Sequence, residues 1–256
     1  METTTSADGT TIAFEQVGDG PTVVIVGGAF SVAADGAPLA KALADAGYRA
    51  VTVDRRGRGS SGDKRGSTPE DEAADLAAVI EAVGGDAAVL GHSSGAVLAL
   101  FAASLGVPVR ALFLSEPPFH FGVDEPDPRL PERLQALIDE GRSDEAVVTF
   151  QLEGVGLPKE MVEGIRQSDQ FAELVAVAQS TVYDATLTRQ VSVPTPEMLG
   201  ISPVTILRGE QTFPILITAA DRLAEEMDGA ELVVVPESVG HRPDPEATAR
   251  VVRARV

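Results

Sequence analysis

A serine between two glycines is the first feature of this sequence that could do chemistry. The segment GHSSG (91–95) fits the pattern G-x-S-x-G, with Ser93 at its centre. It stands between the strand-like run AAVL and the apolar, helix-like run SGAVLALFAASLG. A strand, a tight turn and a helix in this order are the context in which such a serine becomes a nucleophile. The sequence therefore predicts Ser93 as a nucleophile, with a glycine-rich turn that carries an incidental serine as the alternative.

A serine nucleophile needs an imidazole base, and the chain has three histidines. His241 follows a strand-like segment and an SVG turn near the C-terminus, after the serine, as the order serine, acid, histidine requires. We expect His241 to be the base. His92 lies inside the serine turn, where we expect it to line the pocket or pack beside the turn, and His120 lies at the entrance of a helical insertion.

The carboxylate that would orient His241 has two candidates. Glu116 ends the strand-like segment RALFLSE and precedes two prolines, which fix the path of the chain as it leaves the sheet. Glu210, in RGEQTFP, is the alternative. The acid has to orient the imidazole, hold its tautomer and stabilise the imidazolium, so a glutamate is chemically suitable. We expect Glu116 to be the acid, Asp184 to be solvated or to cap a helix, and Asp54 to brace the loop that follows it.

These residues fall between alternating strand-like and helix-like segments. GTTIAFEQVG alternates polar and apolar residues, which predicts an antiparallel entry strand. The segment 69–83 predicts a helix, with Thr68 as N-cap and Pro69 at its first position. The order predicts an α/β fold, a mostly parallel doubly wound sheet that follows an antiparallel N-terminal hairpin. Six short apolar segments, most of them with β-branched residues, predict the parallel strands: TVVIVGG, RAVTVD, AAVLG, RALFLSE, PVTILRG and ELVVVPES.

Residues 119–200 interrupt this alternation, because they contain several helical patterns and no convincing strand. We expect a core of residues 1–118 and 201–256, and a small helical cap of residues 119–200 over the carboxyl ends of the strands. Ligands bind at that edge in open α/β sheets. The residues expected to line the substrate pocket are Gly28, Phe30, His92, Phe119, His120 and Tyr183, with Phe121, Phe150 and Phe171 as further aromatic candidates.

The segment GRGSSG (57–62) also fits G-x-G-x-x-G, a phosphate-binding pattern of dinucleotide sites. In such sites the glycines open a helix directly. Here the helical pattern waits until Thr68 and Pro69, after a polar loop. We therefore interpret residues 57–62 as a structural loop.

Composition restricts the classes of partner. The 256 residues carry a formal net charge of −19, and phosphate binding requires a basic face, so no nucleic-acid or membrane partner is expected. We interpret the acid excess as a solvated surface. The absence of cysteine excludes disulfides and thiolate metal sites. With no leader pattern and no apolar run long enough to span a bilayer, we expect a cytoplasmic protein without metal or cofactor, and a homodimer stays open.

Four motifs in order resemble the α/β-hydrolase superfamily over nearly the whole chain: VVIVGGAF, VDRRGRGSSG, GHSSG and SVGHRPDPEATARVV. They stand at that family's oxyanion strand and turn, its Asp-x-Arg-Gly-x-Gly-x-Ser loop, its nucleophile turn and its terminal Gly-His segment. The resemblance implies an oxyanion hole formed by the backbone N–H groups of Ala29 and Ser94.

The chain departs from the family pattern at two places. Gly27 replaces the usual histidine of the oxyanion turn, and Gln211 and Thr212 stand where the family's aspartate is expected. Some serine hydrolases of the superfamily, among them lactone hydrolases that act on the mycotoxin zearalenone, use a glutamate at the end of the preceding strand. The separation of Ser93 and Glu116 is similar to theirs.

The resemblance and the residues together imply a serine hydrolase of the carboxylesterase or lactonase type. Ser93 would attack an ester or lactone carbonyl, and water would hydrolyse the acyl-enzyme. A serine in place of an aspartate nucleophile argues against the haloalkane dehalogenase and epoxide hydrolase branches. The expected substrate is a medium-sized, largely apolar ester or lactone. The alternatives are C–C bond hydrolysis, a lyase or cyclase step in secondary metabolism, and a ligand-binding scaffold without turnover.

Overall fold

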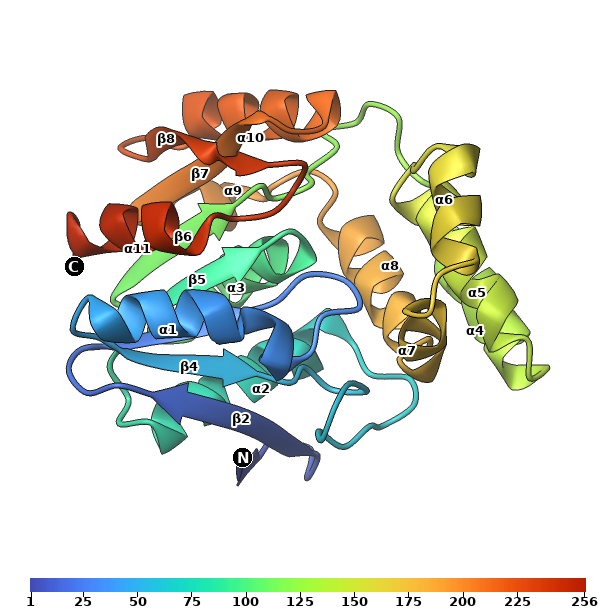
Figure 1. Ribbon diagram of the computed structural model, residues 1–256, viewed down its shortest axis with the longest axis horizontal. Coiled ribbons are helices and arrows are strands. Elements are labelled where there is room, and N and C mark those ends of the chain that lie inside the picture. Colours follow the sequence, from blue (N-terminus) through green and yellow to red (C-terminus); the bar gives the residue numbers. More distant parts are fainter.

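Short apolar, β-branched segments form the middle of a sheet that runs through the whole molecule (Figure 1). The computed structural model describes residues 1–256. Its eight strands lie in the order β1-β2-β4-β3-β5-β6-β7-β8. They are β1 (Glu2–Thr5), β2 (Thr11–Val17), β3 (Thr22–Val26), β4 (Arg49–Val53), β5 (Ala87–His92), β6 (Ala111–Ser115), β7 (Val204–Gln211) and β8 (Glu231–Val239).

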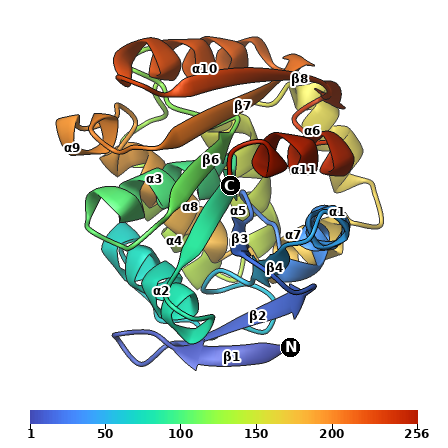
Figure 2. The ribbon, with the colours of Figure 1, turned by 90° about the vertical axis from the view of Figure 1, so that its left-hand side faces the viewer.

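The strand directions confirm the predicted fold class. β1 pairs with β2 and β2 with β4 in antiparallel register, and every later pair from β4 to β8 is parallel. The sheet twists along its length, as Figure 2 shows from the side of the chain termini. The carboxyl ends of the six parallel strands therefore meet at one edge.

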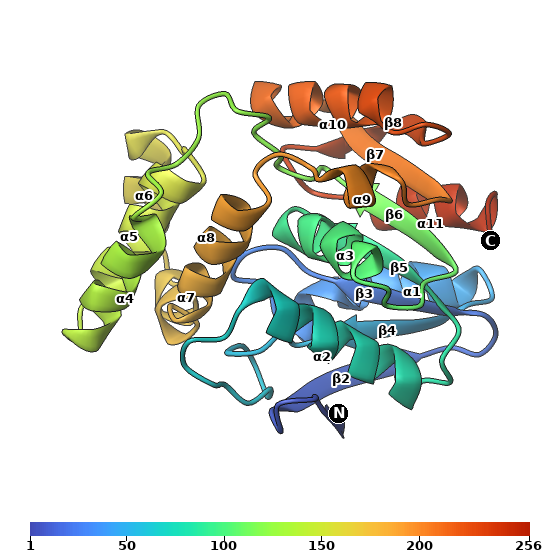
Figure 3. The ribbon, with the colours of Figure 1, turned by 180° about the vertical axis from the view of Figure 1, so that it is seen from behind.

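Helices cover both faces of the sheet, because the strands are apolar on both sides. α1 (Ala37–Asp45) and α11 (Pro245–Arg253) pack on one face, and α2 (Pro69–Ala82), α3 (Ser94–Ser104) and α10 (Pro214–Glu226) on the other (Figures 1 and 3). Alternate residues of one strand join different cores, as the period of two requires: Val23 lies in the core under α1, and Val24 in the core under α2. A short 3-10 helix, η1 (Ala33–Gly36), precedes α1.

The start of α2 agrees with its sequence signals. The Thr68 side chain accepts a hydrogen bond from the Asp71 backbone N–H, the Asp71 carboxylate accepts one from the Thr68 N–H, and Pro69 is the first helical residue. This reciprocal cap satisfies two N–H groups that the helix cannot use itself. It fixes where the loop after β4 ends.

A group of helices gathers beyond the carboxyl ends of the parallel strands (Figure 1). These are α4 (Leu130–Asp139), α5 (Ser143–Thr149), the π-helical turn η2 (Phe150–Gly154), α6 (Lys159–Arg166), α7 (Phe171–Ala176) and α8 (Ser180–Gln190). The short α9 (Pro196–Leu199) leads back to β7. No helix of the chain combines the length and the apolar character needed to cross a bilayer.

One of the helical patterns within residues 119–200 runs without a break over residues 169–187, but the structure divides this segment. The structure separates α7 from α8 at residues 177–179. The Ser180 and Thr181 hydroxyls donate to the carbonyls of Val177 and Ala178, three residues earlier. Such side-chain bonds compete with helical backbone bonds and turn the chain.

Candidate active site

Ser93 lies in a sharp turn between β5 and α3. Its backbone has φ 55° and ψ −127°, in a region that residues with side chains rarely adopt. The flanking glycines are required by close contacts: a Cβ on Gly91 would lie 2.4 Å from the Gly95 carbonyl oxygen, and a Cβ on Gly95 would lie 2.3 Å from that of Val26. The predicted strand, turn and helix are thus present, and they hold the Ser93 side chain at the edge of a cavity.

Two backbone N–H groups beside Ser93 are free. Neither the Ala29 N–H nor the Ser94 N–H donates a hydrogen bond within the protein. Ala29 lies in the turn after β3, and Ser94 is the first residue of α3, where the helix dipole is positive. Both residues line the same cavity as Ser93. This arrangement suits the stabilisation of an oxyanion.

Glu116 and His241 meet at the carboxyl ends of β6 and β8. Oε2 of Glu116 lies 2.5 Å from Nδ1 of His241. The same oxygen accepts a hydrogen bond from the Thr212 hydroxyl at 3.1 Å, and Oε1 accepts one from the Gly209 N–H at 2.9 Å. A Cβ on Gly209 would lie 2.3 Å from the Ser238 carbonyl oxygen and 3.3 Å from Glu116 Oε1. Glycine in β7 is therefore required mainly by the close approach of the β8 backbone, and it also leaves space beside the carboxylate.

The electrostatics keep Glu116 charged. Glu116 is 3% exposed, and burial alone would raise the pKa of its carboxyl group. The hydrogen bonds from His241 and from the Gly209 N–H lower that pKa by more. Glu210, the alternative acid, is exposed and forms no hydrogen bond or ion pair through its side chain. The structure thus brings Glu116, and not Glu210, to the imidazole.

His92 packs against His241. The two ring centroids are 4.5 Å apart, and His92 Nδ1 lies 3.3 Å from the Ser115 hydroxyl. Burial, together with the positive charge that His241 can carry, lowers the pKa of His92 to about 3. His92 is therefore neutral at ordinary pH. The Ser93 hydroxyl makes no hydrogen bond within the protein, and it faces the cavity that His241 also lines.

The cavity has a volume of about 510 Å³ and is bounded by both the sheet edge and the helical group. This volume falls within the range of pockets for small organic ligands. Gln151 of the π-helical turn is 3% exposed, and its Oε1 has no hydrogen-bond partner. The large apolar side chains that line the cavity are those of Phe30, Phe150, Leu157, Ile215 and Leu216.

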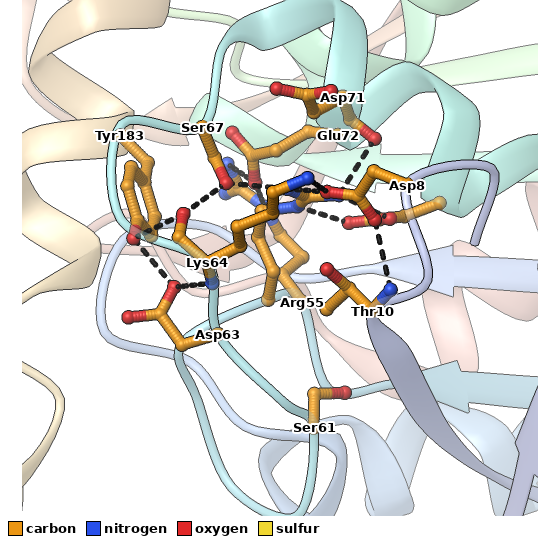
Figure 4. Close-up of polar contacts among 12 residues, drawn as sticks. Asp8, Thr10, Arg55, Ser61, Asp63, Lys64, Ser67, Asp71, Glu72 and Tyr183 are labelled. Atoms are coloured by element: carbon orange, nitrogen blue, oxygen red, sulfur yellow. Dashed lines mark hydrogen bonds and ion pairs between the residues drawn. The ribbon is translucent and has the colours of Figure 1, made fainter. Parts of the chain in front are cut away.

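Four of the six residues expected in the pocket do line the cavity: Gly28, Phe30, His92 and His120. Two expectations were wrong. Phe119 is 2% exposed and packs in the core, with its ring 6.0 Å from that of Phe121. Tyr183 is not among the residues that line the cavity, and its hydroxyl donates to Asp63 at 2.5 Å (Figure 4). A helical period places a side chain on a face but does not say which neighbour covers that face.

Asp184 was expected to be solvated or to cap a helix, and this expectation was wrong. It is 1% exposed and lies between two arginines of the loop after β4. Its Oδ1 lies 3.0 Å from Arg55 Nη1, and its Oδ2 lies 2.6 Å from Arg58 Nη2. Arg55 also pairs with Glu72 of α2 at 2.8 Å. We call Arg55, Arg58, Glu72 and Asp184 the buried arginine cluster.

The charge state of the cluster follows from its pairing. Burial alone would raise the pKa of Asp184, but Arg58 and Arg55 lower it by more. Burial and the neighbouring Arg55 lower the pKa of Arg58 to about 10, which still leaves it protonated at neutral pH. Sequence reasoning treated this loop as structural and missed the cluster. The available signal was a pair of arginines between two apolar elements of an acidic chain.

Asp54 holds the same loop, as expected. Its Oδ2 accepts a hydrogen bond from the Ser60 N–H at 2.8 Å, and its Oδ1 accepts one from the Ala33 N–H at 2.6 Å. A Cβ on Gly59 would lie 2.3 Å from the Asp54 carboxylate. The glycines of GRGSSG therefore serve a tight loop around a carboxylate. No group of three or more acidic or histidine side chains is arranged to hold a metal ion.

The chain is similar in sequence and in fold to known proteins. The model of the alpha/beta hydrolase family matches residues 23–254. An alpha/beta hydrolase from Sphaerobacter thermophilus is 40% identical over 99% of each chain, with a TM-score of 0.91. An esterase from Thermogutta terrifontis is 24% identical over 99% of this chain and 95% of its own, with a TM-score of 0.68. An enol-lactonase from Burkholderia xenovorans is 17% identical over 97% of each chain, with a TM-score of 0.70. No curated protein sequence matches the chain.

Proposed function

Because the chain belongs to the alpha/beta hydrolase family, we propose that it hydrolyses a carboxylic ester or lactone through Ser93, His241 and Glu116. One observation carries the proposal. His241 lines the same cavity as the strained Ser93 turn, and its Nδ1 lies 2.5 Å from the Glu116 carboxylate. A serine, an imidazole and a buried carboxylate in this order are the parts that acyl transfer requires.

The proposed reaction begins at Ser93. Glu116 accepts a hydrogen bond from the Nδ1–H of His241, so the unprotonated Nε2 can take the proton of the Ser93 hydroxyl as its oxygen attacks the carbonyl carbon. The N–H groups of Ala29 and Ser94 stabilise the resulting oxyanion. His241 then gives its proton to the departing alcohol oxygen, and an acyl-enzyme remains. Water, deprotonated by His241, attacks that ester, releases the acid and restores Ser93.

The cavity supports a medium-sized, largely apolar substrate. Residues 119–200 act in this proposal as a cap, because Phe150 and Leu157 contribute apolar walls that face the sheet edge. The unpaired Gln151 amide adds a polar point in these walls, suited to one polar group of the substrate. The esterase and the enol-lactonase that share the fold give ester and lactone as the first classes to test.

A fluorophosphonate probe tests the nucleophile directly. We expect one adduct on folded wild-type protein, located at Ser93 by peptide mass mapping, and none on Ser93→Ala or on heat-denatured wild type. Folded protein that gives no adduct at Ser93 overturns the proposal.

A panel of p-nitrophenyl esters and lactones tests the substrate class. We expect hydrolysis by wild type and a loss of kcat by about 10³-fold or more in Ser93→Ala, since the chemistry passes through that oxygen. A labelled Ser93 without turnover of any ester or lactone would keep the nucleophile and reject the substrate class. That result would direct the search to C–C bond cleavage or another reaction of the same triad.

A further inference from the structure

Arg58 contacts the peptide unit whose N–H is one of the two free donors. Its Nη1 donates to the Gly28 carbonyl oxygen at 2.5 Å. The carbonyl of Gly28 and the N–H of Ala29 belong to the same planar peptide unit, so fixing one end fixes the direction of the other. The Arg58 side chain is fully buried, which makes this contact strong and hard to replace with water.

Arg55, from the same loop, contacts the side chain of the residue that carries the second donor. Its Nη1 donates to the Ser94 hydroxyl at 3.1 Å and lies 3.4 Å from the Gly27 carbonyl oxygen. The N–H of Ser94 is the other free donor at the cavity. The two arginines therefore contact both turns that flank Ser93.

Asp184 connects these contacts to the helical group. It lies on α8 and pairs with both arginines, and the side chains of all three are at most 4% exposed. Glu72 of α2 balances the remaining charge through Arg55. Figure 4 shows the side of the cluster at Arg55 and Glu72, where the loop after β4 meets α2. Four charges are thus removed from water at one point between the sheet edge and α8.

The cluster does not coincide with the loop motif that the chain shares with its family. In VDRRGRGSSG the motif arginine is Arg56, which pairs with Asp75 at 2.6 Å and does not contact either turn. Arg55 and Arg58 occupy variable positions of that motif. Burying charges is costly, and a paired, buried cluster is weak evidence for a purely stabilising role. The contacts of Arg55 and Arg58 with the neighbouring turns favour a role in positioning those turns over a role in stability alone.

We propose that Arg58 and Arg55, held in place by Asp184, are positioning residues for the oxyanion hole. The inference rests on the proposed function. Arg58 holds the Gly28–Ala29 peptide unit with its N–H toward the cavity, and its hydrogen bond to the carbonyl polarises that unit and makes the N–H a better donor. Arg55 holds the start of α3 in place through its hydrogen bond to the Ser94 hydroxyl. Because the donors act on the charge that develops in the transition state, the cluster affects kcat more than KM.

A pair of substrates that differ in one atom isolates this role. Replacing the carbonyl oxygen of an ester with sulfur weakens the hydrogen bonds that an oxyanion hole can make, so the ratio of oxoester to thionoester kcat/KM reports on the hole. The ratio is measured on a single sample and does not depend on how much of the enzyme is folded. Partial unfolding of a variant therefore cannot imitate the effect.

The variants are Arg58→Lys and Asp184→Asn, with Arg56→Lys as the matched control. Arg56 is as fully buried as Arg58 and lies two residues away in the same loop. We expect Arg58→Lys and Asp184→Asn to lower kcat on the oxoester by about tenfold, to leave KM within about twofold, and to reduce the oxoester preference by a similar factor. We expect Arg56→Lys to lower thermal stability and to leave the preference unchanged.

The outcomes separate the two proposals. Equal losses on both esters, with the preference unchanged in Arg58→Lys and Asp184→Asn, overturn the positioning role and leave the hydrolase function standing. A reduced preference in Arg56→Lys as large as that in Arg58→Lys also overturns it, because the effect then belongs to the loop as a whole. Wild type that matches Ser93→Ala on every ester overturns the function, and the positioning role with it.

Discussion

At the scale of single residues, the choice of acid has a direct test. Glu116 is buried and is bound by His241, Gly209 and Thr212, whereas Glu210 is exposed and bound by none of them. We expect Glu116→Gln to lower kcat on a short p-nitrophenyl ester by about 10²–10⁴-fold, because an amide cannot stabilise the imidazolium and can favour the wrong tautomer. Steady-state kinetics measure the loss.

Glu210→Gln is the matched control, with the same chemical change at a carboxylate on the adjacent strand. We expect its kcat to stay within about twofold of wild type, since an exposed side chain without partners does little. A larger loss in Glu210→Gln than in Glu116→Gln would assign the acid to β7 instead.

His92 gives a prediction about stability and pH. Its pKa in the folded protein is lowered to about 3 from the ordinary 6.5, mainly by burial and then by His241, while Glu116 acts in the opposite direction. Between these values the unfolded chain binds a proton that the folded chain does not, so stability falls as the pH falls. Within this range, each fall of one pH unit lowers the unfolding free energy by about 1.4 kcal/mol through this residue. Above about pH 7 the contribution is constant.

The comparison with His92→Gln isolates that slope, because all other titrating groups stay. We expect the difference in unfolding free energy, wild type minus variant, to rise with pH between about 5 and 6.5 and then to level off. Urea denaturation at several pH values measures it. A difference that does not change with pH would mean that His92 is protonated in the folded protein as readily as in the unfolded chain.

The same residues show what a sequence can and cannot reveal at this scale. Ser93, His241 and Glu116 stand in short motifs with strong local signals, so the sequence identified the three side chains that the fold gathers. Asp184 and Tyr183 had no such signal. Their partners, Arg58 and Asp63, lie more than a hundred residues away. Only the fold brings them together, and neither period nor composition encodes that contact.

At the scale of elements, the apolar pattern of the sequence was sufficient to predict the central strands of the sheet. It was not sufficient to predict the edge strand β1 or the break between α7 and α8. The six parallel strands were evident because each is a short apolar run between turns, and most contain β-branched residues. β1 was not, because ETTT is polar and largely exposed and gains its structure from pairing with β2. The break between α7 and α8 was hidden for a related reason, since hydroxyl groups of Ser180 and Thr181 make it while the apolar period continues.

The helical group also explains why substrate specificity is harder to predict than chemistry. The residues of the proposed triad and the two proposed oxyanion donors lie at or near strand ends, whose positions the sheet dictates. The Phe150 and Gln151 walls come from a π-helical turn, a local departure that sequence patterns do not forecast and that is frequent at functional sites. In the proposed function, short motifs therefore predict the reaction, whereas the shape of the substrate pocket depends on how α4–α8 pack.

At the scale of the whole molecule, the charge balance leads to a prediction about salt. The chain has 39 acidic and 20 basic residues, and most of its ion pairs lie on the surface. Each exposed pair contributes about 0–1 kcal/mol, and salt weakens it. The unpaired acids repel one another, and salt weakens that repulsion as well. With a net charge of −19, repulsion outweighs the pairs, so we expect salt to stabilise the fold.

Urea denaturation in NaCl from about 0.02 to about 0.5 M should therefore show the unfolding free energy rising by on the order of 1 kcal/mol, since the screening length falls from well above to well below the spacing of surface charges. Glu160→Lys on α6 is the charge-changing variant, because Glu160 is exposed and has no ion pair. It removes two units of net negative charge and should reduce the salt dependence, whereas Glu160→Gln should reduce it by half as much. A stability that falls with added salt would show that the surface pairs, and not the excess of acids, dominate the electrostatics of this fold.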